Sequence, residues 1–119
     1  MVPFIAILVI IFVANSVSAY AETQVTITVY ASSPNCADNE TCYSPSELTT
    51  LVVNNVTWLN DSGVIHTVTS GSPLEGPDGT FDSSIIMSGD TFSHTFTEAG
   101  NYQYFCTIHP WMTGTVVVV

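Results

Sequence analysis

A cysteine, a histidine and a methionine lie within seven residues near the end of the chain, as Cys106, His109 and Met112. A thiolate stabilises the soft Cu(I) ion, imidazole binds both oxidation states of copper, and a thioether is a weak ligand that tunes the reduction potential. A second histidine must come from elsewhere in the chain, and His66 is the best candidate. The spacing therefore predicts one copper ion bound by His66, Cys106, His109 and Met112.

Other kinds of site fit these residues less well. A catalytic Cys–His pair usually comes from distant parts of a sequence, and no oxyanion or substrate motif accompanies this one. A structural zinc site usually recruits two or more cysteines and no methionine. A binuclear copper centre would need a second cysteine beside Cys106. Because most methionines are core residues, packing is the alternative role for Met112.

Short runs of β-branched and aromatic residues, separated by turn residues, predict an all-β fold. A chain of 119 residues has room for a single domain, and strands at this spacing indicate a β-sandwich. Loops are expected at 31–38 and 71–79. The expected strands cover residues 24–30, 48–53, 56–59, 66–70, 91–96, 101–106 and 114–119.

Strand alternation predicts how the copper ligands are presented. Along 101–106, Cys106 shares a face with two tyrosines, so its thiol points inward if that face is the core. Pro110 cannot continue a regular ladder, and the ligands around it are expected from a tight loop before the last strand. With His66 approaching from a neighbouring strand, two nitrogens and a thiolate would lie in a plane, with a weak sulfur above it.

The chain carries ten acidic residues and no lysine or arginine, which gives a formal net charge of −10. Binding of the domain to nucleic acid or to an anionic lipid surface is excluded, because no basic side chain can neutralise phosphate. A cationic protein partner fits this charge. Selection for solubility alone is the other explanation of the same composition.

The N-terminal segment has the pattern of a secretory signal peptide. Residues 3–14 are almost wholly apolar, and the small-x-small sequence Ala19-Tyr20-Ala21 follows. No lysine or arginine precedes the apolar run, so an uncleaved membrane anchor is the alternative. Residues 1–21 are therefore expected to direct export, and residues 22–119 to form the copper-binding domain. The domain is expected in a periplasmic, pseudo-periplasmic or extracellular space, tethered to the membrane if the segment is retained.

Three cysteines suit an exported protein with a metal site. Cys36 and Cys42 flank a short polar stretch and could close a small disulfide loop, which leaves Cys106 unpaired for the metal. Three Asn-x-Ser/Thr sequons are also compatible with surface glycosylation. They begin at Asn39, Asn55 and Asn60.

Residues 102–118 resemble the C-terminal end of plastocyanins and amicyanins, the small blue copper proteins of the cupredoxin fold. Residues 56–61 and 66–68 look like the first-histidine segment of that family, and 92–100 like the strand and corner before the ligand loop. The resemblance covers roughly residues 44–119. It implies a cupredoxin-like Greek-key β-sandwich, with all four ligand positions filled and with His109 as the solvent-facing ligand through which the electron leaves.

Three features depart from the plant plastocyanin pattern. The Cys-x-x-His-x-x-Met spacing is the short, amicyanin-like form. Thr67 stands where the family often has an asparagine that ties the two ligand segments together, so the sequence leaves open whether this brace exists. Phe105 stands where plant plastocyanins have a tyrosine, which gives little support for a second electron route.

The ligand set favours a monomeric carrier that passes one electron at a time between redox partners, such as cytochromes and multicopper or respiratory oxidases. No enzymatic activity is expected, because the site has no evident open position for a substrate. A copper storage or delivery protein with the same ligands is the alternative, and a purely structural domain is a second one. Trp111 is expected to be exposed beside His109 and to form an apolar docking patch with Pro110. His94 is expected to be a hydrogen-bonded structural residue on an apolar face.

Overall fold

The computed structural model describes residue 3 and residues 23–119. The predicted signal segment, residues 1–21, lies outside the described residues apart from Pro3. Within the described part of the chain, none of the helices has the length and apolar character needed to cross a bilayer.

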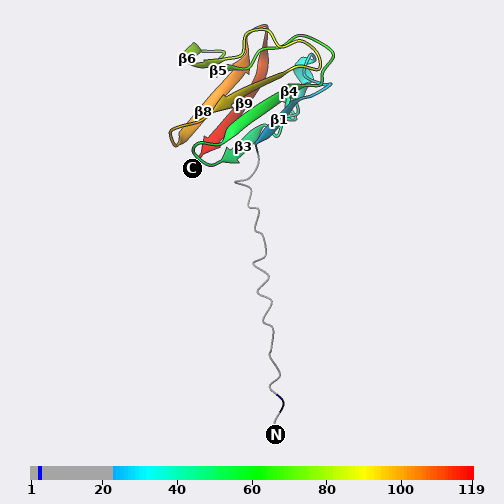
Figure 1. Ribbon diagram of the computed structural model, residues 1–119. Coiled ribbons are helices and arrows are strands. Elements are labelled where there is room, and N and C mark those ends of the chain that lie inside the picture. The colour runs from blue at the N-terminus through cyan, green and yellow to red at the C-terminus, as the bar shows by residue number, and fades with distance from the viewer. Residues whose placement is uncertain (1–2, 4–22) are drawn as a thin grey trace.

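Two β-sheets pack face to face (Figure 1). The first sheet has the strand order β2 (Tyr43–Ser44), β1 (Gln24–Ile27), β4 (Asn55–Asn60) and β7 (Thr91–Thr95). The second has the order β3 (Glu47–Thr50), β9 (His109–Val118), β8 (Gly100–Cys106), β5 (Thr69–Ser72) and β6 (Gly76–Asp82). A short 3-10 helix, η1 (Pro34–Ala37), precedes β2. The predicted all-β, single-domain sandwich is confirmed.

Alternating residues of the strands form the core between the sheets. Every second residue of β1, β3 and β4 is buried, as expected for strands with one face on a core. Trp58 lies at the centre, with its ring 5.4 Å from that of Tyr104 and 5.6 Å from that of Phe92. The aromatic side chains therefore join the two sheets.

Several of the expected elements differ in the structure, and the strand predicted for residues 48–53 ends at Thr50. The strand predicted for residues 24–30 ends at Ile27, and Val29 is 60% exposed. The segment 71–79, expected to be a loop, forms most of the hairpin between β5 and β6. Its glycines permit this, since Gly71 has a φ of +122° and a Cβ there would collide with the carbonyl oxygen of Gly76. The Gly- and Pro-rich composition marked a tight hairpin instead of an open loop.

His94 has a structural role through ring packing. Its imidazole lies 4.9 Å from the ring of Phe81 and 4.8 Å from that of Phe96, measured between ring centroids. Burial lowers the pKa of His94. The neutral ring therefore belongs to the aromatic cluster at the edge of the core.

Tyr104 packs against a glycine on the neighbouring strand. Tyr104 and Gly114 are cross-strand partners of β8 and β9, and Tyr104 is 1% exposed. A Cβ atom at position 114 would overlap the Cζ and hydroxyl of Tyr104 and would lie 2.8 Å from its Cε2. The absence of a side chain at 114 is what gives the tyrosine its place in the core.

We expect Gly114→Ala to lower the free energy of unfolding by about 1–3 kcal/mol, because Tyr104 must leave its present position. Chemical denaturation of the metal-free protein measures the change. Thr113→Ala, at the exposed neighbouring position, is the control and should change stability by less than about 0.5 kcal/mol. Equal stability of the two variants would contradict this account of the packing.

Candidate metal centre

The turn between β8 and β9 brings a thiol and an imidazole together. Cys106 ends β8 and pairs with His109, the first residue of β9, while the preceding pair joins Phe105 to Thr113. Residues 110–112 are therefore extra on β9 and bulge out of the ladder. Pro110 lies in this bulge, where its missing N–H costs no ladder hydrogen bond. The expected loop between the last two strands is thus a two-residue turn at 107–108 followed by a bulge.

His66 reaches the same place from the segment that connects β4 to β5. It lies ahead of β5, in a single bridge to Ile86, whose N–H donates to the His66 carbonyl over 2.8 Å. The buried Asn60 side chain holds both flanks, because its Nδ2 donates to the carbonyls of Val64 (2.7 Å) and Ile86 (3.0 Å). The prediction of a strand beginning at residue 66 is corrected here, since His66 is held by an isolated backbone bridge and by the Asn60 side chain before the ladder starts at Thr69.

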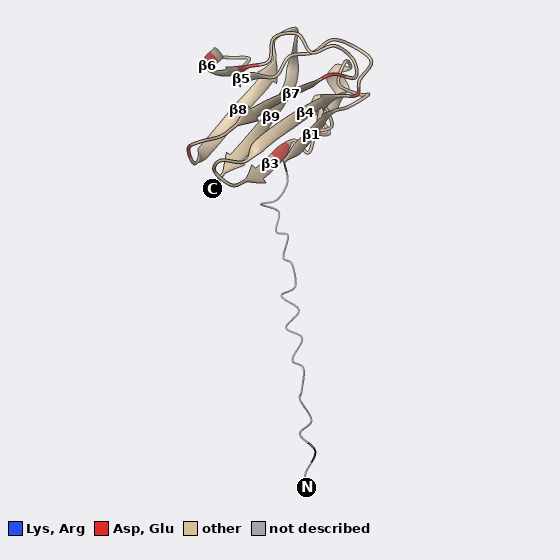
Figure 2. Cartoon of the chain, in the orientation of Figure 1, with Lys and Arg blue, Asp and Glu red and all other residues tan. Residues whose placement is uncertain are grey.

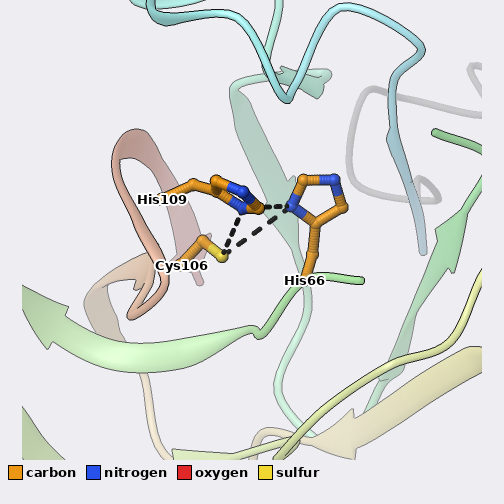
Figure 3. A group of neighbouring side chains, drawn as sticks. All are labelled: His66, Cys106 and His109. Atoms are coloured by element: carbon orange, nitrogen blue, oxygen red, sulfur yellow. Dashed lines mark hydrogen bonds between the residues drawn. The ribbon is translucent and has the colours of Figure 1, made fainter. Parts of the chain in front are cut away.

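Three donor atoms from these segments converge (Figure 3). The Nδ1 atoms of His66 and His109 are 3.0 Å apart. Cys106 Sγ lies 3.8 Å from Nδ1 of His66 and 3.6 Å from Nδ1 of His109. A thiol and two imidazole nitrogens thus face one small volume, although His66 and Cys106 are 40 residues apart in sequence.

The predicted ligands differ in their access to solvent. His66, Cys106 and Met112 are fully buried, and Met112 belongs to the same core cluster as Cys106. His109 is partly exposed. Among the four, His109 therefore offers the shortest way from the donor cluster to the surface.

Burial also determines the charge of the inner histidine. Desolvation, and secondarily the neighbouring imidazole of His109, lowers the pKa of His66 to about 4. The ring is therefore neutral at neutral pH. A neutral imidazole keeps a lone pair available to bind a metal ion.

Thr67 ties the two ligand segments together, which answers the question that the sequence left open. Its N–H donates to Cys106 Sγ over 3.3 Å, and its Oγ1 accepts the N–H of Thr107 over 2.9 Å. The hydroxyl of Tyr43 donates to the carbonyl of Thr67 over 3.1 Å. Burial, followed by the influence of Tyr104 and Cys106, raises the pKa of Tyr43, so this donor keeps its proton. Thr67 thus provides the brace that an asparagine often provides in the plastocyanins and amicyanins that the sequence resembles.

The sequence profile of the copper-binding proteins, plastocyanin/azurin family, matches residues 30–119. The chain belongs to this family. An amicyanin from Paracoccus versutus is 30% identical over 117 residues, which covers 91% of this chain and 88% of the amicyanin. A plastocyanin from Sambucus nigra is 31% identical over 91 residues, 68% of this chain and 91% of the plastocyanin. The structure of a purple cupredoxin from Nitrosopumilus maritimus, 34% identical, matches with a TM-score of 0.70 over 82% of this chain and 100% of that chain.

The donor set of this cupredoxin fits the copper ion that its family binds. Copper accepts thiolate and imidazole ligands in both oxidation states, and the three donor atoms all lie within 4.8 Å of one another. The cofactor is one type 1 copper ion, in agreement with the prediction from spacing.

The structure corrects the expectation for Trp111. Its ring lies beside His109, with 5.1 Å between ring centroids, but it is only partly exposed. Its Nε1–H donates to the carbonyl of Ala31 over 3.0 Å. Ala31 leads into the loop that the Cys36–Cys42 disulfide closes. This disulfide confirms the cysteine pairing that the sequence suggested. No local signal marks this contact, because the two partners are 80 residues apart.

One of the three sequons is blocked by the fold. The Asn60 side chain is fully buried, and both its amide and its carbonyl groups form hydrogen bonds. Asn39 and Asn55 are exposed. The sequence pattern alone gave the three positions equal standing, and burial removes Asn60 from the surface sites.

We expect Thr67→Val to lower the free energy of unfolding of the metal-free cupredoxin by about 1–2 kcal/mol, because the Thr107 N–H loses its acceptor. Chemical denaturation measures the loss, and amide exchange at Thr107 should accelerate. Thr67→Ser is the matched control, since it keeps the hydroxyl group. If the serine variant were destabilised as strongly as the valine variant, the hydroxyl would not be the cause.

Proposed function

We propose that this cupredoxin is an exported one-electron carrier whose copper ion is bound by His66, Cys106, His109 and Met112. The observation that carries the proposal is the convergence of Cys106 Sγ and the two Nδ1 atoms at separations of 3.0–3.8 Å. When bound, copper supplies a couple between Cu(I) and Cu(II) that takes up and releases one electron. Met112 is assigned from its spacing and its burial in the same core cluster.

The residues around the proposed ligands keep the site in one arrangement. Asn60 and the bridge to Ile86 hold His66, while Thr67 holds both Cys106 and the turn that follows it. These groups are hydrogen-bonded in a buried environment, where each broken bond carries a desolvation cost. A framework of this kind resists movement of the ligands when the charge of the site changes, which suits repeated electron transfer.

Electron transfer through His109 fits the surface around it. Ile108 is 41% exposed, and Val64 and Ile65, which lead to His66, are 38% and 41% exposed. Apolar side chains at the edge of the site lose little on desolvation and suit a brief contact with a partner. The buried ligands then need no direct access to a partner or a substrate.

One cleft of the described structure opens beside Trp111. This cleft of about 320 Å³ lies on the outer face of the second sheet and is lined by Trp111, Gln103 and Thr113, among others. None of the four proposed ligands lines it. A molecule held in this cleft would therefore touch none of the proposed copper ligands, which agrees with a carrier role.

Charge and cysteine chemistry support the proposed partner and location. Acidic residues are spread over several parts of the described structure (Figure 2), and the full sequence contains no lysine or arginine to balance them. A cationic redox protein, of the cytochrome or oxidase type, complements this surface. The Cys36–Cys42 disulfide supports an oxidising compartment outside the cytoplasm.

The ligand assignment is tested by the visible spectrum. The protein loaded with Cu(II) should show intense thiolate-to-copper absorption, and Cys106→Ser should abolish it, because no other free cysteine exists among the described residues. His94→Asn, in the aromatic cluster, is the control and should keep the band. A wild-type protein that binds Cu(II) without intense visible absorption would overturn the assignment.

The carrier role is tested by electron exchange with a cationic cytochrome at several ionic strengths. The rate should fall as salt rises, because the net charge of −10 attracts the partner at long range. An anionic cytochrome is the control and should show the opposite dependence. Copper should stay bound through repeated cycles, whereas its release to an acceptor protein in one cycle would favour storage or delivery.

A further inference from the structure

We propose that the exposed carboxylate of Asp82 acts on the copper site through three threonine hydroxyl groups. Asp82 is a positioning residue that stabilises the turn after Cys106. Its charge also lowers the reduction potential of the copper ion. The effect on the potential rests on the proposed function. The effect on the turn concerns the metal-free protein as well.

The hydroxyl groups form a continuous chain from the ligand turn to the surface. Thr107 Oγ1 lies 3.2 Å from Thr67 Oγ1, which lies 3.0 Å from Thr69 Oγ1. Thr69 Oγ1 donates to Asp82 Oδ1 over 3.2 Å. Thr67 and Thr69 are 4% and 1% exposed, while Thr107 and Asp82 at the two ends are exposed. The two middle hydroxyl groups are thus shielded from water.

The carboxylate gives this chain one direction. An ionised carboxylate can only accept hydrogen bonds, so the hydroxyl proton of Thr69 is donated to Asp82. Thr69 Oγ1 must then accept the hydroxyl proton of Thr67. The proton of Thr67 is then used as well. Thr67 Oγ1 is left with two lone pairs, which accept the N–H and the O–H of Thr107. Each hydroxyl group is satisfied without conflict, and every proton points towards Asp82.

This direction matters because Thr67 Oγ1 is the acceptor that holds the turn after Cys106. Hydrogen bonds in a chain polarise one another, which strengthens each bond by about 10–30%. The bond to the charged end is itself stronger than a bond between neutral groups. The negative end therefore makes Thr67 Oγ1 a better acceptor for the Thr107 N–H. The same polarisation, close to Cys106 Sγ, favours Cu(II) over Cu(I) and so lowers the reduction potential.

Asp78 provides a matched control on the same hairpin. Both carboxylates lie on β6, both accept a hydroxyl group from β5, and both accept a backbone N–H two residues later. Asp78 accepts from Ser70, whose other partners are the backbone groups of Phe81. This second set of bonds does not lead to Thr67, so its charge has no hydroxyl chain to act through.

The first experiment uses the metal-free protein and amide exchange at Thr107. Asp82→Asn should raise the exchange rate roughly threefold relative to the wild type, after correction for global stability, because the charge at the end of the chain is lost. Asp78→Asn should leave the rate unchanged. An unchanged rate in Asp82→Asn would overturn the proposal, and this arm does not depend on copper binding.

The second experiment measures the reduction potential of the copper-loaded protein. Asp82→Asn should shift the ratio of Cu(II) to Cu(I) at a given potential roughly threefold towards Cu(I), equivalent to an increase of about 28 mV for one electron. In the Thr69→Val background the same substitution should have almost no effect, because the chain is already cut. Thr69→Ser should restore the sensitivity to Asp82→Asn.

The double-mutant cycle separates the chain from a direct effect of charge. If Asp82→Asn shifts the potential equally in the wild-type and in the Thr69→Val backgrounds, the carboxylate acts through space and the proposal is wrong. If the loaded protein lacks thiolate-to-copper absorption, the proposed function fails, while amide exchange at Thr107 still decides whether Asp82 supports the turn.

Discussion

Two segments separated by 40 residues must be held within hydrogen-bond distance for the metal centre to exist, and Thr67 makes that contact. Its backbone N–H donates to Cys106 Sγ, and its hydroxyl oxygen accepts the N–H of Thr107. Its carbonyl accepts the hydroxyl of Tyr43. Each bond is in or at the edge of the core, where an unpaired polar group is costly. The convergence of the donor atoms follows from this contact, since His66 precedes Thr67 and Thr107 follows Cys106.

The sandwich supplies the frame on which this contact depends. β8 and β9 carry the turn and the bulge, and β4 presents Asn60 to the segment that contains His66. The aromatic side chains between the sheets hold these strands at one separation, because a packed core does not deform continuously. The site therefore draws its rigidity from the core beneath it, and His109 alone of the four proposed ligands meets solvent.

Much of the fold and site could be predicted from local patterns. Alternation correctly indicated that Cys106 and Tyr104 face the core, and the cysteine count correctly left Cys106 outside a disulfide. The β5–β6 hairpin was missed, because glycine and proline mark both open loops and tight hairpins, and the choice depends on long-range pairing. The partly buried position of Trp111 was also missed, because its partner Ala31 is far away in the sequence.

The sequence by itself determined the types of donor atom, their spacing and the absence of basic residues, because these are properties of the chain that no packing can change. Only the tertiary structure decided that a threonine could replace the usual brace, that Asn60 is a structural clamp, and that Asp82 connects to the site through hydroxyl groups. These contacts depend on strand register and on side chains meeting across the sandwich. A shift of one residue in register would turn those side chains to the other face, so no local pattern can specify them.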